Sequence, residues 1–150
     1  MIELDVERRT FGPQDGVPEP VAPYSHVVRV GTLLFLTGQL PLDPVSGSVV
    51  GSDVATQTDL VIANLASVLA LCGAALADVV QVRAYLTSMD LYDDFNAAYA
   101  PRFAAALPVR TCIAVSGLAR GALVEIDAVA HHDGSPPRAL RGRRYRPHRP

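Results

Sequence analysis

The chain has 150 residues, of which 49% are hydrophobic and 19% charged, which suits one folded domain and excludes general disorder. All 13 basic residues are arginine, and the lack of lysine excludes Schiff-base catalysis, an internal pyridoxal aldimine and a Walker-type lysine. The net charge of −2 hides an asymmetry: residues 1–137 hold seven arginines against fifteen acidic residues, whereas residues 138–150 hold six arginines and no acid. The acidic body argues against general nucleic-acid binding.

Three strands are predicted in the first part of the chain. Residues 2–9 alternate and predict an edge strand, and the four prolines and two glycines of residues 11–23 predict a connecting loop. Residues 26–30 and 33–37 are rich in β-formers and flank Gly31-Thr32, which suits a type II′ hairpin turn. Another turn is predicted at residues 43–47.

A helix is predicted between Asp53, a suitable N-cap, and Gly73, just beyond the C-terminal end. Its apolar stripe has helical spacing and consists of Val54, Val61, Leu65, Val68 and Cys72. The uncharged run of residues 60–77 reaches the length of a membrane span. Because Asn64 and Ser67 interrupt that run, we interpret it as a buried amphipathic helix and expect no membrane span.

The second part of the chain predicts three strands and one more helix. Residues 79–87 alternate, with Val80, Val82, Ala84 and Leu86 on the face predicted to be buried. A helix is expected from Asp90 to about Ala100, where Pro101 should end or kink it. Residues 109–116 and 123–131 predict the last strands. Residues 1–135 therefore form one predicted domain, and the Arg- and Pro-rich residues 136–150 a disordered tail.

This order, β-β-β-α-β-α-β-β, indicates an α+β fold with a six-stranded mixed sheet. Two helices cover only one face of such a sheet. Yet the strands carry aliphatic residues on both faces, as at residues 33–36 and 123–129. Leaving the second face bare would expose a large apolar patch, so we expect another copy of the chain to cover it.

Two charged residues stand out within aliphatic strands. Arg110 shares one side of its predicted strand with Cys112, and Glu125 lies within the run of residues 122–126. Buried charges are costly unless they are paired or used. Arg110 and Glu125 therefore either form a structural ion pair or face solvent, or they belong to a functional site. In such a site Arg110 would bind a substrate carboxylate, and Glu125 would act on a water molecule or a proton near the reacting carbon.

The remaining candidate groups are weaker. Cys72 and Cys112 have no CxxC spacing, so reduced thiols and a cytoplasmic protein are expected, and Cys112 is interpreted as a small buried residue. The first residues are acidic and unlike a signal peptide. Residues 131–133, His-His-Asp, have no third ligand at suitable spacing, so no metal site is predicted.

The order of several short motifs resembles the RidA/YjgF family of reactive-intermediate deaminases. These motifs are Ala22-Pro23-Tyr24-Ser25-His26, residues 35–41, Asp43-Pro44-x-x-Gly47, Phe95-Asn96-x-x-Tyr99, Pro108-Val109-Arg110-Thr111-Cys112 and residues 121–130. Together they span about residues 17–131, which is the whole predicted folded part. Several separated motifs in one order are more specific than any single motif.

The resemblance implies a chorismate-mutase-like fold assembled as a homotrimer, with active sites between subunits. It implies hydrolysis, without a cofactor, of enamines and imines such as 2-aminoacrylate and 2-iminopropanoate to 2-oxo acids and ammonia. Carried over by position, Arg110 holds the substrate carboxylate and Glu125 orients or activates water. The family's pocket-lining positions correspond to Tyr24, Thr37, Asn96 and Cys112.

Two alternatives stay open within this family. One is a pathway-specific enzyme that acts on a larger imine or enamine. The other is a non-catalytic module that keeps the carboxylate grip, although the presence of both Arg110 and Glu125 counts against it. A ribonuclease activity, ascribed to some relatives, is not expected from the acidic body.

Overall fold

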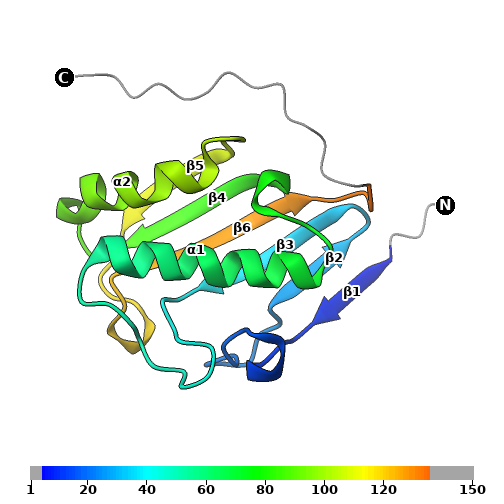
Figure 1. Ribbon diagram of the computed structural model, residues 1–150, viewed down its shortest axis with the longest axis horizontal. Coiled ribbons are helices and arrows are strands. Elements are labelled where there is room, and N and C mark those ends of the chain that lie inside the picture. Colours follow the sequence, from blue (N-terminus) through cyan, green and yellow to red (C-terminus); the bar gives the residue numbers. More distant parts are fainter. Residues whose placement is uncertain (1–4, 136–150) are drawn as a thin grey trace.

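Six strands form one mixed sheet in the computed structural model, which describes residues 5–135 (Figure 1). The strands are β1 (Val6–Arg9), β2 (Val27–Val30), β3 (Leu33–Gln39), β4 (Val79–Leu86), β5 (Val109–Ala114) and β6 (Val124–His131). Their order across the sheet is β1-β2-β3-β6-β4-β5, and every neighbouring pair is antiparallel except the parallel pair β4–β5. The tail predicted at residues 136–150 lies outside the described residues.

Two helices, α1 (Val54–Leu71) and α2 (Tyr92–Phe103), lie side by side on one face of this sheet (Figure 1). Helix α1 packs on β3 and β6, and α2 lies against α1. Short 3₁₀ turns occur at Pro13–Asp15, Leu76–Asp78, Met89–Leu91 and Ala119–Gly121. The predicted α+β class, the six strands and the coverage of one sheet face by two helices are confirmed.

Local turn and cap chemistry explains where the elements begin and end. Gly31 has a φ of +58° between β2 and β3, as the first central residue of a type II′ turn requires. At the start of α1, an Asp53 carboxylate oxygen accepts a hydrogen bond of 2.8 Å from the backbone N–H of Thr56. Beyond its end, Gly73 adopts a φ of +79°. The predicted hairpin and both predicted ends of α1 are confirmed.

Helix α1 is long and apolar enough to cross a membrane by length and composition alone. Its predicted stripe is instead buried in the core formed with the sheet, as are other apolar residues of the helix such as Ile62 and Leu69. The polar Asn64 is also buried, and its amide donates to the carbonyls of Leu40 at 3.1 Å and Leu42 at 2.9 Å. The geometry is that of a core helix that also anchors the segment after β3.

Two details of the predicted elements are wrong. In β4, Val79 is buried and Val80 is 45% exposed, because a bulge between Val79 and Gln81 shifts the alternation. Helix α2 does not end near Ala100 but continues through Pro101 to Phe103, so of the two predicted effects of Pro101 only a kink stays open. Proline removes the hydrogen bond to the carbonyl of residue 97, but Ala97 is exposed, so water can satisfy that carbonyl.

The sheet face opposite the helices has no cover within the described chain and carries apolar side chains. The strand registers place Leu33, Phe35, Val109, Ile113 and Val129 on this open face. Phe35 is 43% exposed and Val109 is 69% exposed. An apolar face of this kind is typical of a surface that another protein chain covers.

Replacing Asn64 tests its anchoring role. Asn64→Ala leaves the carbonyls of Leu40 and Leu42 without their buried donor, so the free energy of unfolding should fall by about 1–3 kcal/mol. Urea denaturation followed by circular dichroism measures this loss. Ser67→Ala on the exposed side of the same helix is the matched control and should change stability by less than about 0.5 kcal/mol. Equal stability of both variants would contradict the assignment.

Candidate active site

Arg110 lies on the edge strand β5 and points toward the helix layer. In the parallel register, Arg110 lies beside Val82 of β4 and Cys112 beside Ala84. Val82 and Ala84 are buried in the core beneath the helices. Neighbours in register point the same way, so Arg110 and Cys112 also face the helices, and their predicted placement on one side of the strand is confirmed.

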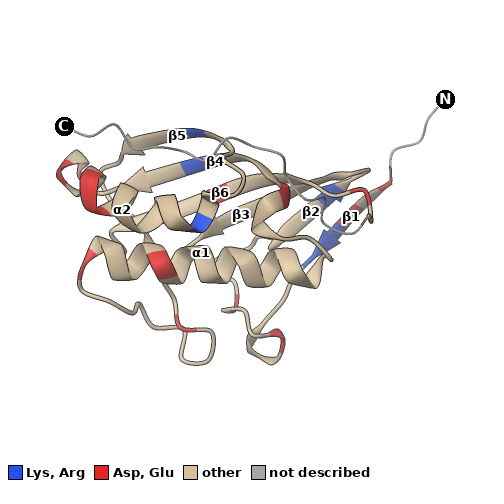
Figure 2. Ribbon diagram, turned by 45° about the horizontal axis from the view of Figure 1, so that its top comes forward, with Lys and Arg blue, Asp and Glu red and all other residues tan. Residues whose placement is uncertain are grey.

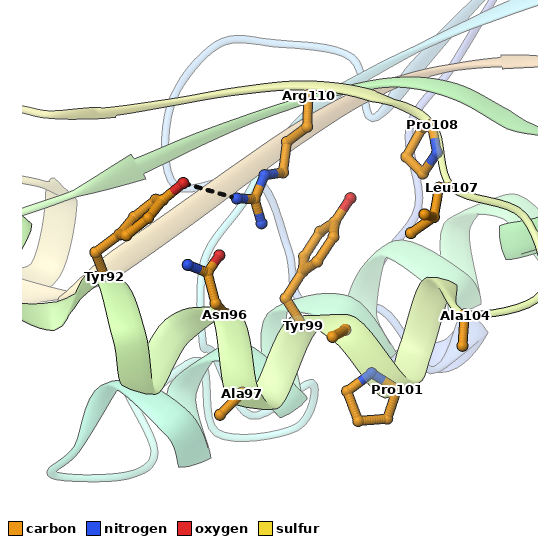
Figure 3. A pocket seen from close by; sticks show the side chains of 10 residues that line it. Tyr92, Asn96, Ala97, Tyr99, Pro101, Ala104, Leu107, Pro108 and Arg110 are labelled. Atoms are coloured by element: carbon orange, nitrogen blue, oxygen red, sulfur yellow. Dashed lines mark hydrogen bonds between the residues drawn. The ribbon is translucent and has the colours of Figure 1, made fainter. Parts of the chain in front are cut away.

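Aromatic side chains of α2 surround the Arg110 guanidinium (Figure 3). Its central carbon lies 4.7 Å from the ring centre of Tyr99, 5.4 Å from that of Phe95 and 5.8 Å from that of Tyr92. One terminal nitrogen donates a 3.2 Å hydrogen bond to the Tyr92 hydroxyl. Among residues 5–135, the ion pairs of arginine involve Arg9, Arg83 and Arg102, so Arg110 has no acidic partner there.

A pocket of about 670 Å³ opens beside this guanidinium. Tyr92, Asn96 and Tyr99 line one side of it, and small apolar residues of α2 together with Leu107 line the rest (Figure 3). Two buried atoms in its wall, the Asn96 side-chain oxygen and the Tyr99 hydroxyl, have no hydrogen-bond partner among the described residues. Burial raises the pKa of Tyr99 to about 12, so its hydroxyl stays protonated at neutral pH. The pocket offers a cation and polar atoms on an apolar background.

Cys112 is half-buried two residues beyond Arg110. Burial raises the pKa of its thiol, and the positive charge of Arg110 only partly opposes that effect. The thiolate is the nucleophilic form of cysteine, so a thiol with a raised pKa is a poor nucleophile. These properties support the interpretation of Cys112 as a small, partly buried residue, and it is not among the residues that line the pocket beside Arg110.

Glu125 faces the other side of the sheet. Its neighbours Val124 and Ile126 are buried in the core under the helices, so the alternation of β6 directs Glu125 to the open face. A Cβ added to Gly38 would collide with the Glu125 carboxyl group, so this side chain lies directly over the Gly38 backbone. The alternative of an ion pair between Arg110 and Glu125 is wrong, because the two side chains leave opposite faces of the sheet.

A second carboxylate, that of Asp127, shares the open face with Glu125. The Arg83 Nε donates to both of its oxygens, at 2.8 and 3.1 Å, and the Tyr85 hydroxyl donates at 3.0 Å. Burial raises the pKa of Glu125, and the negative charge of Asp127 raises it further. Glu125 therefore holds a proton more readily than an ordinary glutamate does.

Tyr24 and Thr37 adjoin the same glycine. A register shift in the pairing of β3 with β6 occurs at Thr37 and Gly38, and the Thr37 N–H donates to the carbonyl of His26 at 3.0 Å. The Tyr24 hydroxyl accepts a 3.1 Å hydrogen bond from a backbone N–H in the preceding loop. Tyr24, His26 and Gly38 border one small pocket. Tyr24 and Thr37 thus belong with Glu125.

The six predicted site residues therefore form two groups, one on the side of α2 and one around Gly38, and Arg110 and Glu125 lie on opposite faces of the sheet. We call them the arginine group (Asn96, Arg110, Cys112) and the glutamate group (Tyr24, Thr37, Glu125). Strands β5 and β6 follow each other in the chain, but β4 lies between them in the sheet. Arg110 on β5 and Glu125 on β6 are therefore not on neighbouring strands. Within one chain, neither group holds both the cation and the carboxylate.

Tyr92 is the site residue that the sequence analysis missed. Tyr92, Asn96 and Tyr99 have the i, i+4, i+7 spacing of one helix face, which was the available signal. That face provides the one side-chain hydrogen bond of Arg110 within residues 5–135, to the Tyr92 hydroxyl. His131 and His132, which were considered as metal ligands, do not line this pocket. The His132 Nδ1 lies 3.6 Å from an Asp78 carboxylate oxygen. Residues 5–135 contain no cluster of three potential metal-binding side chains.

Comparisons with known proteins point to one family. The family described as Endoribonuclease L-PSP matches residues 15–132. A RutC family protein of Pyrococcus horikoshii is 36% identical over 119 residues, which are 79% of this chain and 94% of that protein. The family match includes every residue of the arginine and glutamate groups.

Solved structures agree with this similarity. RidA from an Antarctic Psychrobacter species is 26% identical, with a TM-score of 0.78 over 83% of this chain and 99% of that one. Escherichia coli TdcF, solved with bound serine, is 25% identical, with a TM-score of 0.78 over 84% of this chain and 99% of that one. The fold of the described residues is therefore RidA-like.

The proton affinity of Glu125 gives a test of the site's electrostatics. We expect a pKa above the ordinary glutamate value, and Asp127→Asn should lower it because a nearby negative charge is removed. A pH titration of the Glu125 carboxyl carbon by NMR measures both values. Asp59→Asn, far away on α1, is the control and should leave the Glu125 pKa unchanged. A Glu125 pKa that stays the same or rises in Asp127→Asn would contradict this account.

Proposed function

Because the chain belongs to the RidA/YjgF family, which also bears the names L-PSP and RutC, we propose that it hydrolyses enamines and imines of small carboxylic acids. Membership confirms the resemblance that the motifs predicted. The products are a 2-oxo acid and ammonia, with 2-aminoacrylate and its tautomer 2-iminopropanoate as model substrates. The observation that carries the proposal is a guanidinium that borders a pocket and has no acidic partner among residues 5–135.

In the proposed reaction Arg110 anchors the substrate carboxylate. A planar guanidinium binds a carboxylate through paired, charge-assisted hydrogen bonds, and the attraction strengthens in a partly apolar setting. The aromatic rings around Arg110 leave its charge uncompensated by any described acid. Anchoring the acid end brings the C=N carbon to a defined place, which is the main requirement for attack by water.

Glu125 is proposed to act as the general base and general acid of the reaction. Starting from the protonated imine, the Glu125 carboxylate takes a proton from water as the oxygen adds to the C=N carbon and the π electrons move to nitrogen, which forms a carbinolamine. Glu125 then returns that proton to the amine nitrogen. The C–N bond breaks with its electrons on the departing ammonia, and Glu125 takes the hydroxyl proton as the C=O bond of the 2-oxo acid forms. A raised pKa suits a group that accepts and returns one proton near neutral pH. An imine carbon is already electrophilic, so the proposed chemistry calls for no cofactor.

The site is proposed to form between copies of the chain, in a homotrimer. Arg110 and Glu125 leave opposite sheet faces, so a second copy is needed to supply the missing half. The apolar open face supports such an assembly, since pairing would bury residues such as Phe35. The number three comes from the family resemblance. The serine bound by TdcF, a small molecule with a carboxylate, is consistent with an acid-binding site in this family.

Pocket size favours one variant of this proposal, a substrate larger than 2-iminopropanoate. In the single chain the pocket of about 670 Å³ exceeds what a three-carbon acid fills, and Ala104 and Leu107 line it together with Arg110. Small apolar walls accept an aliphatic or aromatic side chain. Imines of larger amino acids are therefore candidate substrates, and a panel of them, with ammonia as the readout, ranks the choices.

Replacing Arg110 tests the carboxylate anchor. Arg110→Ala should lower kcat/KM for freshly generated 2-aminoacrylate by about 100-fold or more, because the charge that positions the substrate is lost. Ammonia release measures the effect, and size-exclusion chromatography with light scattering shows that assembly is unchanged. Arg102→Ala removes an exposed arginine of α2 that pairs with Asp59 and should retain activity. Unchanged turnover in Arg110→Ala would reject the proposal.

Mixing two inactive variants tests whether sites are shared between copies. Arg110→Ala and Glu125→Gln each destroy one half of the site, but a mixed trimer contains junctions with both wild-type residues. After unfolding and refolding together at equal amounts, about one quarter of the junctions should be intact. Ammonia release should therefore return to about a quarter of the wild-type rate per chain. No recovery in properly assembled mixed trimers would place both groups in one chain's site.

A further inference from the structure

One face of α2 presents a polar stripe to Arg110. Tyr92, Asn96 and Tyr99 follow at i, i+4 and i+7, and all three side chains rise from the helix toward the guanidinium (Figure 3). The Asn96 oxygen and the Tyr99 hydroxyl are buried. Tyr92 differs from them because its hydroxyl lies at the pocket and already accepts a hydrogen bond from Arg110.

The Tyr92 hydroxyl can still donate one hydrogen bond. Its oxygen accepts from the Arg110 terminal nitrogen at 3.2 Å, and its own proton has no acceptor among residues 5–135. A phenolic hydroxyl both accepts and donates, so this O–H is a free donor adjacent to the cation. A carboxylate accepts several hydrogen bonds, more than one arginine edge supplies.

The aromatic rings of α2 also limit which part of the Arg110 guanidinium an anion can reach. Three aromatic rings lie within 6 Å of its central carbon. Such rings attract the cation but donate no hydrogen bond to an anion. The hydrogen bond to Tyr92 restricts the rotation of the guanidinium and holds the Tyr92 hydroxyl beside it.

We propose that Tyr92 is a second carboxylate-binding residue, whose hydroxyl accepts from Arg110 and donates its proton to the same substrate carboxylate. This rests on the proposed function, since it assigns a residue to that function's acid-binding step. Binding to a carboxylate then involves Arg110 and Tyr92 as one unit. Their contributions to affinity should accordingly be interdependent.

Binding of pyruvate, the 2-oxo acid product of the model reaction, tests this separately from turnover. Tyr92→Phe keeps the ring and removes only the hydroxyl, so the Kd for pyruvate should rise by about 10-fold. The Kd for pyruvamide, which is uncharged, should stay within about twofold of wild type. NMR titration of the full chain measures both. Ser67→Ala deletes a hydroxyl on the exposed side of α1 and is the matched control.

A double-mutant comparison isolates the shared role. Adding Tyr92→Phe to Arg110→Ala should weaken pyruvate binding no further, because the hydroxyl acts together with the guanidinium. In the unaltered protein, the Cζ resonance of Tyr92 should move on addition of pyruvate and not of pyruvamide. That measurement decides the matter if Tyr92→Phe fails to fold.

The possible failures are distinct. Wild-type affinity for pyruvate in Tyr92→Phe, with a loss in Arg110→Ala, overturns the role of Tyr92 and leaves the proposed function standing. Equal losses for pyruvate and pyruvamide also overturn it, because a general disturbance of the pocket is then the cause. No binding of pyruvate to the wild-type protein at tens of millimolar overturns the carboxylate site altogether.

Discussion

A guanidinium held by aromatic rings and one hydroxyl, without a described carboxylate partner, is the interaction on which the proposed chemistry depends. An arginine paired with an internal acid is satisfied and has little affinity left for a ligand. Arg110 is stabilised instead by the faces of Tyr92, Phe95 and Tyr99, which attract its charge without neutralising it. The guanidinium is therefore held in place and still able to bind an anion.

The sheet imposes the second constraint. Side chains alternate along a strand, so a residue belongs either to the helix-covered face or to the open face. Arg110 is on the first and Glu125 on the second, and β4 lies between their strands. Arginines lie on β1, β2, β4 and β5, whereas the acidic residues Glu125 and Asp127 lie on β6 (Figure 2). A site that uses both Arg110 and Glu125 thus calls for contact between two copies, which the apolar open face favours.

Most elements were predictable because their signals are local. The N-cap at Asp53, the glycine at residue 73 and the hairpin at Gly31 depend on backbone conformations that a few neighbouring residues determine. The bulge at Val80 and the continuation of α2 through Pro101 were missed. Each depends on surroundings: the register with β6 in the first case, and the solvent access of a carbonyl in the second.

The candidate site divides in the same way. Chain order and residue type were enough to identify Arg110 and Glu125 as unusual charges in aliphatic strands, to place the chain in its family and to predict six strands with two helices, because short-range patterns carry that information. Only the tertiary structure decided that these two charges leave opposite faces, that Glu125 lies over Gly38 and that Tyr92 reaches Arg110. Those relations join residues far apart in the chain, and they depend on strand order and packing rather than on sequence spacing.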